Sequence, residues 1–180
     1  MATFELSSFQ PTQDLGLIAA IETPNTGILQ IGFWVNDPNQ SIQWQSAVKN
    51  HTRQDYLWEN TCFEVFIGVK GQDFYREINL SPTLSWQAYQ FEEYRYPETM
   101  PPQAADDIEL IDAQRTKFGL TAILDINPFL HSQNVKIKDI FMGLSAVIQT
   151  DGQQHFFAMQ HSGQHADFHN KRDWLYTFYA

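Results

Sequence analysis

The stretch TCFEVFIGV, residues 61–69, constrains the fold more than any other part of the sequence. Its residues alternate as in a β-strand, and one face carries only apolar side chains: Phe63, Val65, Ile67 and Val69. The other face carries Glu64 and Phe66, where a simple half-buried strand would carry Thr, Ser or Lys. We therefore predict a strand with one core face and a second face whose role needs its own explanation.

A predicted hairpin fixes what lies beside this strand. We interpret Gly71 and Gln72 as a two-residue loop, with Gly suited to the first central position of a type II′ turn. The apolar faces of the two strands then match, whereas a one-residue slip would oppose apolar and polar faces. The register pairs Val69 with Phe74, Ile67 with Arg76, Val65 with Ile78, Phe63 with Leu80, Glu64 with Asn79, and Phe66 with Glu77. Glu64 and Glu77 become diagonal neighbours on one face, roughly 5 to 8 Å apart.

Short alternating runs recur along the chain and predict an all-β fold, either a sandwich or a barrel. The runs are 17–21, 28–35, 61–69, 74–80, 86–91, 118–125, 140–149, 155–161 and 174–179. Asp151-Gly152 predicts a second two-residue hairpin loop, of type I′. Helical structure is expected only as a helix or turn near 39–48 and a single turn at 127–130.

Length and composition favour one domain spanning residues 1–180, with 43% hydrophobic and 14% aromatic residues. The 21 acidic residues against 11 Lys and Arg give a net charge of −10, which disfavours binding to nucleic acid or to an anionic membrane. No run approaches the ~20 apolar residues of a spanning helix. The N-terminal residues do not resemble a secretory signal and Cys62 has no cysteine partner, so we expect a cytoplasmic protein.

The polar face of the predicted hairpin allows three interpretations. Glu64, Glu77 and Asn79 could simply face water. The aromatic residues Trp58 and Trp86 nearby favour instead a binding surface for a sugar-sized or planar ligand, with stacking and hydroxyl contacts. The third interpretation is a retaining glycoside hydrolase that uses Glu64 and Glu77, since two carboxyl groups about 5 Å apart can act as acid and nucleophile.

A second cluster of interest is HSGQHADFHN, which places His161, His165 and His169 four residues apart. Ser162-Gly163 argues against a helix, so we expect a loop. Metal binding by the three imidazoles is one interpretation. The other is structural hydrogen bonding by Asp167 and His169 ahead of the last strand.

The Pro- and acid-rich segment 96–107 lacks apolar periodicity and contains Pro101-Pro102. It is expected to form a long surface loop, with a lid over a site as the alternative.

Taken together, these residues resemble the bacterial DOMON-like proteins, relatives of family 9 carbohydrate-binding modules. The resemblance runs from Trp58 to His169 and is carried by Trp58-x-x-Thr61-Cys62-Phe63-Glu64-x-Phe66, by Glu77-x-Asn79-x-Ser81-Pro82-x-x-x-Trp86-x-x-Tyr89-x-Phe91-x-x-Tyr94-Arg95, and by Asp167-Phe168-His169. It implies an immunoglobulin-like or jelly-roll β-sandwich of two antiparallel sheets, with a ligand against one sheet and no catalysis. Relatives bind sugars or haem.

The resemblance also implies roles for particular residues. Trp58 and Glu64 match a Trp and a Glu that contact the sugar in the carbohydrate-binding modules. Those modules add a second aromatic residue late in the chain, where this sequence has Phe168 and His169, followed by Trp174. Haem-binding relatives use Met and His as axial ligands, and Met142 and Met159 are the methionines considered for that role.

The sequence thus predicts a non-catalytic domain that binds a small ligand, most simply a carbohydrate, with no cofactor or metal assigned. A haem or redox module is the alternative, and a glycoside hydrolase the more remote one. In the favoured interpretation Trp58 and Trp86 stack on the ligand, and Arg95 contacts an anionic group. The ligand-binding residues predicted are Trp58, Glu64, Glu77, Asn79, Trp86, Arg95, Asp167 and His169.

Overall fold

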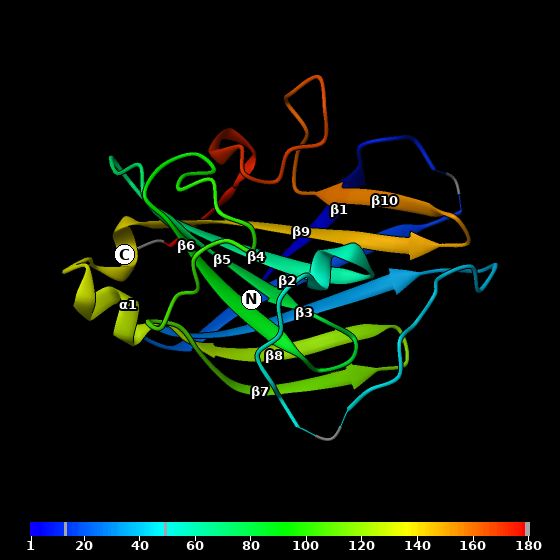
Figure 1. The fold of residues 1–180 in the computed structure, drawn as a ribbon, viewed down its shortest axis with the longest axis horizontal. Helices are drawn as coiled ribbons and strands as arrows, with labels where there is room; N and C mark the ends of the chain where they lie inside the picture. The colour runs from blue at the N-terminus through cyan, green and yellow to red at the C-terminus, as the bar shows by residue number, and fades with distance from the viewer. Residues whose placement is uncertain (13, 49, 179–180) are drawn as a thin grey trace.

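Eleven antiparallel β-strands form the framework of the chain in a computed structural model that describes residues 1–12, 14–48 and 50–178 (Figure 1). The strands are β1 (Ala2–Ser8), β2 (Gly16–Asn25), β3 (Ile28–Asn36), β4 (Cys62–Val69), β5 (Tyr75–Leu80), β6 (Trp86–Phe91), β7 (Glu109–Thr116), β8 (Gly119–Asp125), β9 (Ile140–Thr150), β10 (Gln153–Ala158) and β11 (Tyr176–Thr177). A short helix α1 (Asn127–Ser132) and the 3-10 turns η1 (Leu57–Glu59), η2 (Ile137–Asp139) and η3 (Lys171–Asp173) connect them. The all-β prediction is confirmed.

The strands belong to one continuous sheet in the order β6-β5-β4-β9-β10-β1-β2-β3-β8-β7, with β11 on β9. The expected division into two separate sheets is therefore not what the structure shows. Strand β1 joins the two halves, because its first residues pair with β2 while Ser7 and Ser8 pair with β10. Because β1 pairs with strands of both halves, the sheet is continuous and is not divided into the two separate sheets of a sandwich.

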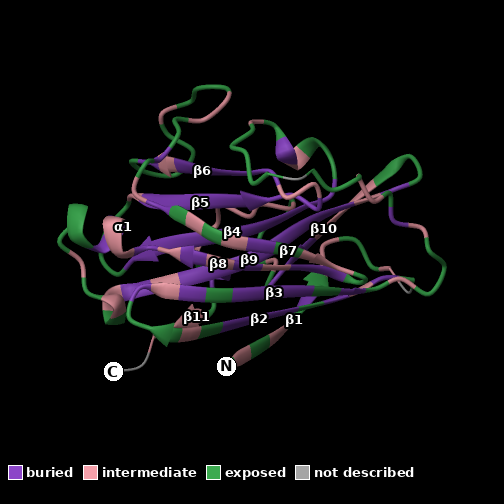
Figure 2. Ribbon diagram, turned by 90° about the horizontal axis from the view of Figure 1, so that it is seen from below, coloured by how far each residue is buried: buried purple, intermediate pink, exposed green. Residues whose placement is uncertain are grey.

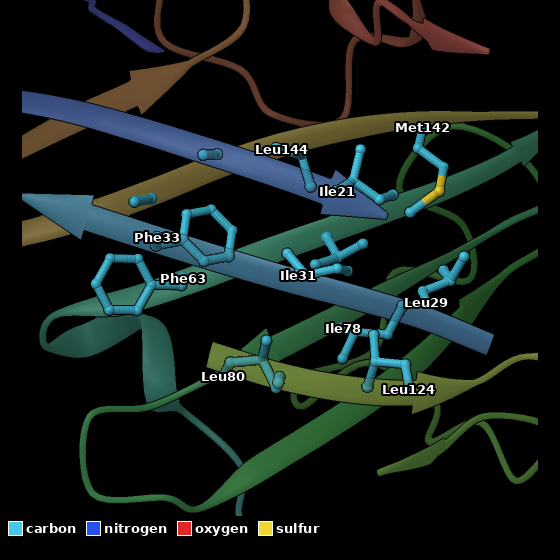
Figure 3. Close-up of a cluster of buried hydrophobic side chains, with 14 of the residues drawn as sticks. Ile21, Leu29, Ile31, Phe33, Phe63, Ile78, Leu80, Leu124, Met142 and Leu144 are labelled. Atoms are coloured by element: carbon cyan, nitrogen blue, oxygen red, sulfur yellow. The ribbon is translucent and has the colours of Figure 1, made fainter. Parts of the chain in front are cut away.

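The sheet curls until it is nearly closed, like a barrel. Phe33 on β3 and Phe63 on β4 lie five strands apart in the sheet order, yet their rings stack at a centroid distance of 4.9 Å (Figure 3). Residues 51–54 run between the edge strands: Thr52 accepts from the Trp86 backbone N–H of β6 at 3.0 Å, and His51 Nε2 lies 3.0 Å from the Ala113 carbonyl of β7. Both halves of the sheet thus enclose one apolar core.

The β4–β5 hairpin has the predicted register, with Phe63 opposite Leu80, Glu64 opposite Asn79 and Phe66 opposite Glu77. The apolar parity of β4 lies in the core, as expected. The predicted two-residue loop is wrong: the paired region ends at Gly68, and Gln72 donates its backbone N–H to Val69 at 3.1 Å. Gly71 takes its positive φ of 75° in this wider turn.

The other predicted elements are confirmed in part. The β9–β10 loop at Asp151-Gly152 is in the predicted place, but type I′ is wrong because only Gly152 has positive φ. Residues 39–48 contain no helix among those described; a turn at 38–39 precedes a single bridge from Ile42 to Thr150. Strands β1 and β7 were not predicted, and β7 is an edge strand on which only Ala113 is buried. A weakly buried edge strand leaves little periodicity to detect.

Strand β4 is buried along its whole length, on both faces of the sheet (Figure 2). The face away from the core is covered by a second cluster of five buried residues: Phe66, Tyr75, Tyr89, Phe91 and Trp174. Trp174 can lie there because Gly143 has no side chain; a Cβ at Gly143 would lie 2.3 Å from Trp174 Cδ1. The face of β4 that carries Glu64 and Phe66 therefore belongs to a second packed layer, and the candidate site lies beside this layer.

No helix in the described part of the chain is long and apolar enough to span a membrane.

Candidate ligand-binding pocket

A pocket of about 480 Å³ opens on the face of β4 and β5 that points away from the core. The loop after β6, the turn η1 and the segment before η3 form its walls. Its lining comprises Trp58, Glu64, Glu77, Phe91, Arg95, Pro97, Glu98, Thr99, Met100, Pro102, Val147, Gln154, Phe156, Ala166, Phe168 and His169. This volume suits a small molecule of one or two rings.

The two carboxyl groups of the predicted patch, Glu64 and Glu77, both line the pocket and are 3% and 5% exposed. Burial raises the pKa of Glu64 well above the usual value, and the neighbouring Glu77 charge raises it further, against the effect of Arg95. Burial also raises the pKa of Glu77 to about 7, although Asn79 and Arg95 offset part of the rise. Both groups therefore keep their protons to a higher pH than an exposed glutamate does, and Glu77 is poised between its two forms near pH 7.

Glu64 lies between two polar neighbours, Asn79 on β5 and Ser145 on β9. The Asn79 Nδ2 and Oδ1 atoms and the Ser145 Oγ atom are buried and have no hydrogen-bond partner among the described residues. Asn79 lies near Glu77 but outside hydrogen-bonding geometry. Unpaired buried polar atoms are costly, so this row retains hydrogen-bonding capacity that the protein does not use internally.

His169 continues the polar floor toward the C-terminal part of the chain. Its Nδ1 lies 2.7 Å from the Tyr75 hydroxyl oxygen, which also accepts the Arg95 backbone N–H at 3.1 Å. Burial keeps the pKa of Tyr75 above its usual value, so the hydroxyl keeps its proton and can donate it to Nδ1. The Nε2–H then faces Glu77 Oε2 at 3.5 Å. Burial and the Arg95 charge lower the pKa of His169 to about 3, which makes the imidazole neutral at pH 7.

Arg95 lies at the rim of the pocket with about half of its side chain exposed. Its Nη2 donates to Asp167 Oδ1 at 2.9 Å, and the Tyr94 hydroxyl donates to Asp167 Oδ2 at 2.8 Å. Asp167 itself does not line this pocket. The positive charge of Arg95 is therefore already balanced within the protein.

Aromatic side chains from four separate segments form the apolar walls: Trp58 from η1, Phe91 from β6, Phe156 from β10 and Phe168 from the segment before η3. Trp58 lies on a turn that follows the left-handed residue Tyr56, and its ring contacts the buried Tyr89 ring edge-to-face at 5.8 Å. The proline-rich loop expected between residues 96 and 107 supplies the remaining wall through Pro97 and Pro102, among others. The structure thus places this loop beside the pocket.

Of the eight residues predicted to bind a ligand, five line the pocket: Trp58, Glu64, Glu77, Arg95 and His169. Asn79 and Asp167 lie directly behind them, next to Glu64 and Arg95 respectively. Trp86 is the exception. It pairs with Leu80 and lies in the core, on the opposite face of the sheet from Glu64, with the Arg53 guanidinium 4.9 Å from its ring. The expectation that Trp86 stacks on a ligand beside Glu64 is wrong, because the Trp86 side chain lies on the other face of the sheet.

Phe91 and Phe156 line the pocket but were not predicted. Phe91 is five residues from Trp86 on the same strand, so the two side chains point to opposite faces. Phe91 pairs with Tyr75, and working out this register of β6 against β5 would have placed Phe91, not Trp86, among the predicted ligand-binding residues. Phe156 carried no comparable signal, because β10 reaches the pocket only through the order of strands in the sheet.

The histidine cluster does not come together as three metal ligands. His161 Nε2 lies 2.9 Å from the Ser7 carbonyl, His169 lies in the pocket, and His165 is exposed. Within the described ranges, no group of three or more His, Cys, Asp or Glu residues is placed to hold a metal ion.

The residues considered for haem do not form an axial pair. Met142 and Met159 are both buried in the core, and both ring nitrogens of His169 already face protein groups. Met100 lines the pocket, but it lies on the exposed loop. The donor set therefore does not fit the axial ligation that the resemblance implied as an alternative.

Comparison with known proteins places the fold. No protein-family model matches the sequence, and no curated protein matches it significantly. A crystal structure of a candidate carbohydrate-binding protein from Bacteroides uniformis is similar, with a TM-score of 0.64 and 12% sequence identity. The alignment covers 96% of this chain and 84% of that one. At this identity the similarity establishes a shared fold.

Proposed function

We propose that the pocket binds a small carbohydrate and that the chain does not convert it. The observation that carries the proposal is that the carboxyl groups of Glu64 and Glu77 line the same pocket as aromatic walls, with the unpaired polar atoms of Asn79 and Ser145 behind Glu64. A sugar offers hydroxyl groups to the carboxyl groups and an apolar C–H face to the aromatic walls. A protonated Glu64 can both donate and accept, which suits hydroxyl partners. The similarity in fold to a candidate carbohydrate-binding protein supports the same choice.

Saccharide titrations test this proposal directly. Intrinsic Trp fluorescence and calorimetry of the whole chain with a panel of mono- and disaccharides should reveal binding that Trp58→Ala weakens. Trp34→Ala is the matched control, because Trp34 is 38% exposed on β3 and does not line the pocket. If no saccharide gives a signal, or if both variants weaken binding equally, the proposal fails.

A glycoside hydrolase is the second candidate, because the pocket brings two carboxyl groups together and raises the pKa of each. One acid and one ionised carboxylate are what retaining hydrolysis needs. Release of a chromophore from aryl glycosides, abolished separately by Glu64→Gln and by Glu77→Gln, would favour this enzyme over a binding domain. Binding without turnover favours the first proposal.

A further inference from the structure

The pocket contains more acidic than basic side chains. Glu64, Glu77 and Glu98 contribute acidic groups, and Arg95 is the one lining residue with a permanent positive charge among those described. Arg95 is already paired with Asp167 at 2.9 Å. No Lys or Arg of the described chain lies within ion-pair distance of Glu64 or Glu77, and the single such contact of Glu77 is the His169 ring.

We infer that the ligand carries a protonated amine, as an amino sugar does, and that this amine is held between Glu64 and Glu77. The inference rests on the proposed function, since it concerns the same pocket and specifies the class of carbohydrate. An ammonium group supplies the charge that two adjacent buried carboxylates lack, and its N–H groups donate to them. The net charge of −10 further favours the approach of a cation.

The walls of the pocket suit a cation as well as they suit a sugar ring. Trp58, Phe91, Phe156 and Phe168 surround the acidic floor from four different segments. Aromatic faces attract ammonium groups, and desolvated sites strengthen that attraction. An anionic ligand would instead have to compete with Asp167 for Arg95 and would approach Glu64 and Glu77 with like charge.

Binding of a cation should release protons. In the empty pocket, burial favours the protonated forms of Glu64 and Glu77, and an entering ammonium group stabilises the ionised forms. The displaced protons leave to solvent. The titratable and charged groups that face this pair are Cys62 on β4, Tyr75 on β5, Tyr89 on β6, Arg95 and Glu98 in the following loop, and His169 before η3. The thiol, both phenols, the guanidinium and the imidazole are not expected to change charge between pH 6 and 8, because the pKa of the thiol, of both phenols and of Arg95 is raised and that of His169 is about 3.

Calorimetry at pH 7 with glucose, glucosamine and glucuronate tests the charge preference. Glucosamine should bind about tenfold or more tightly than glucose, and glucuronate more weakly than both. Choline, whose charge does not titrate, isolates the pH effect. Its affinity should fall about tenfold per pH unit below pH 7 if one proton is released, and titrations in two buffers of different ionisation enthalpy should show that proton directly.

Variants locate the effect. Glu77→Gln should remove most of the preference for glucosamine over glucose and flatten the choline profile, while folding is checked by circular dichroism. Glu109→Gln makes the same chemical change at an exposed position on β7 and should leave the preference unchanged. If Glu77→Gln does not fold, Glu64→Gln answers the same question.

The outcomes separate the inference from the function on which it rests. If glucose or glucuronate binds as tightly as glucosamine or more tightly, the preference for a cationic ligand is overturned, but carbohydrate binding is not. Binding of choline with no response to any sugar supports the cation and overturns the carbohydrate. No binding of any of these probes overturns both.

Discussion

The two buried carboxyl groups should make the protein less stable as the pH rises from 4.5 to 7. The pKa of Glu77 is about 7 in the folded chain, against an ordinary value of 4.5. A group whose pKa is raised by folding costs nothing below its unfolded value, and its cost grows until the folded value is passed. The interval corresponds to roughly 3 kcal/mol for Glu77 alone. Glu64, whose pKa is also raised, adds a cost of the same sign.

Urea denaturation at pH 5, 6, 7 and 8 measures this effect. Relative to the double variant Glu64→Gln/Glu77→Gln, the parent protein should lose at least roughly 3 kcal/mol of unfolding free energy between pH 5 and 8, since Glu64 adds to the cost from Glu77. The single variant Glu77→Gln should show an intermediate loss, because removing its charge also eases the ionisation of Glu64. The exposed variant Glu109→Gln should follow the parent curve. Parallel curves for the parent and the double variant would contradict a raised pKa of Glu64 and Glu77 in the folded chain.

Three further changes test the site and its support. Trp58→Ala should weaken ligand binding by about 1 to 3 kcal/mol with a small change in melting temperature, because Trp58 is only half-buried; a large loss of stability without a change in calorimetric affinity would contradict this. Gly143→Ala should destabilise the chain by about 1 to 3 kcal/mol in urea and alter the near-ultraviolet dichroism of Trp174, which its methyl group would displace; an unchanged spectrum would argue against the packing described. Arg76→Met should cost about 3 to 5 kcal/mol because it leaves Asp107 unpaired, and adding Asp107→Leu should recover much of the loss; a cost below about 1 kcal/mol would show that the pair is dispensable.

The local pattern of apolar and polar residues was sufficient to predict side-chain positions where the chain forms regular strands. The alternation of β4, together with apolar matching across the hairpin, placed Glu64 beside Asn79 and diagonal to Glu77, as the structure has them. The predicted register is correct although the predicted turn type is wrong. Opposing an apolar face to a polar one would cost far more free energy than forming a wider loop. Where no such register was worked out, as for Trp86 on β6, the side chain was assigned to the wrong face.

Alternation of apolar and polar residues within short segments predicted most of the strands, the core-facing side of β4 and the acidic pair, since each of these depends on local spacing alone. The closure of the sheet through β1 and the covering of its outer face depend instead on contacts between segments that are distant in the chain. Glu77 and His169 meet across segments far apart in the chain, and the connection that carries His169 has no periodicity to reveal its path. The physical reason is that long connections are positioned by packing and by burial of aromatic residues such as Trp174 over Gly143, contacts that no local pattern specifies.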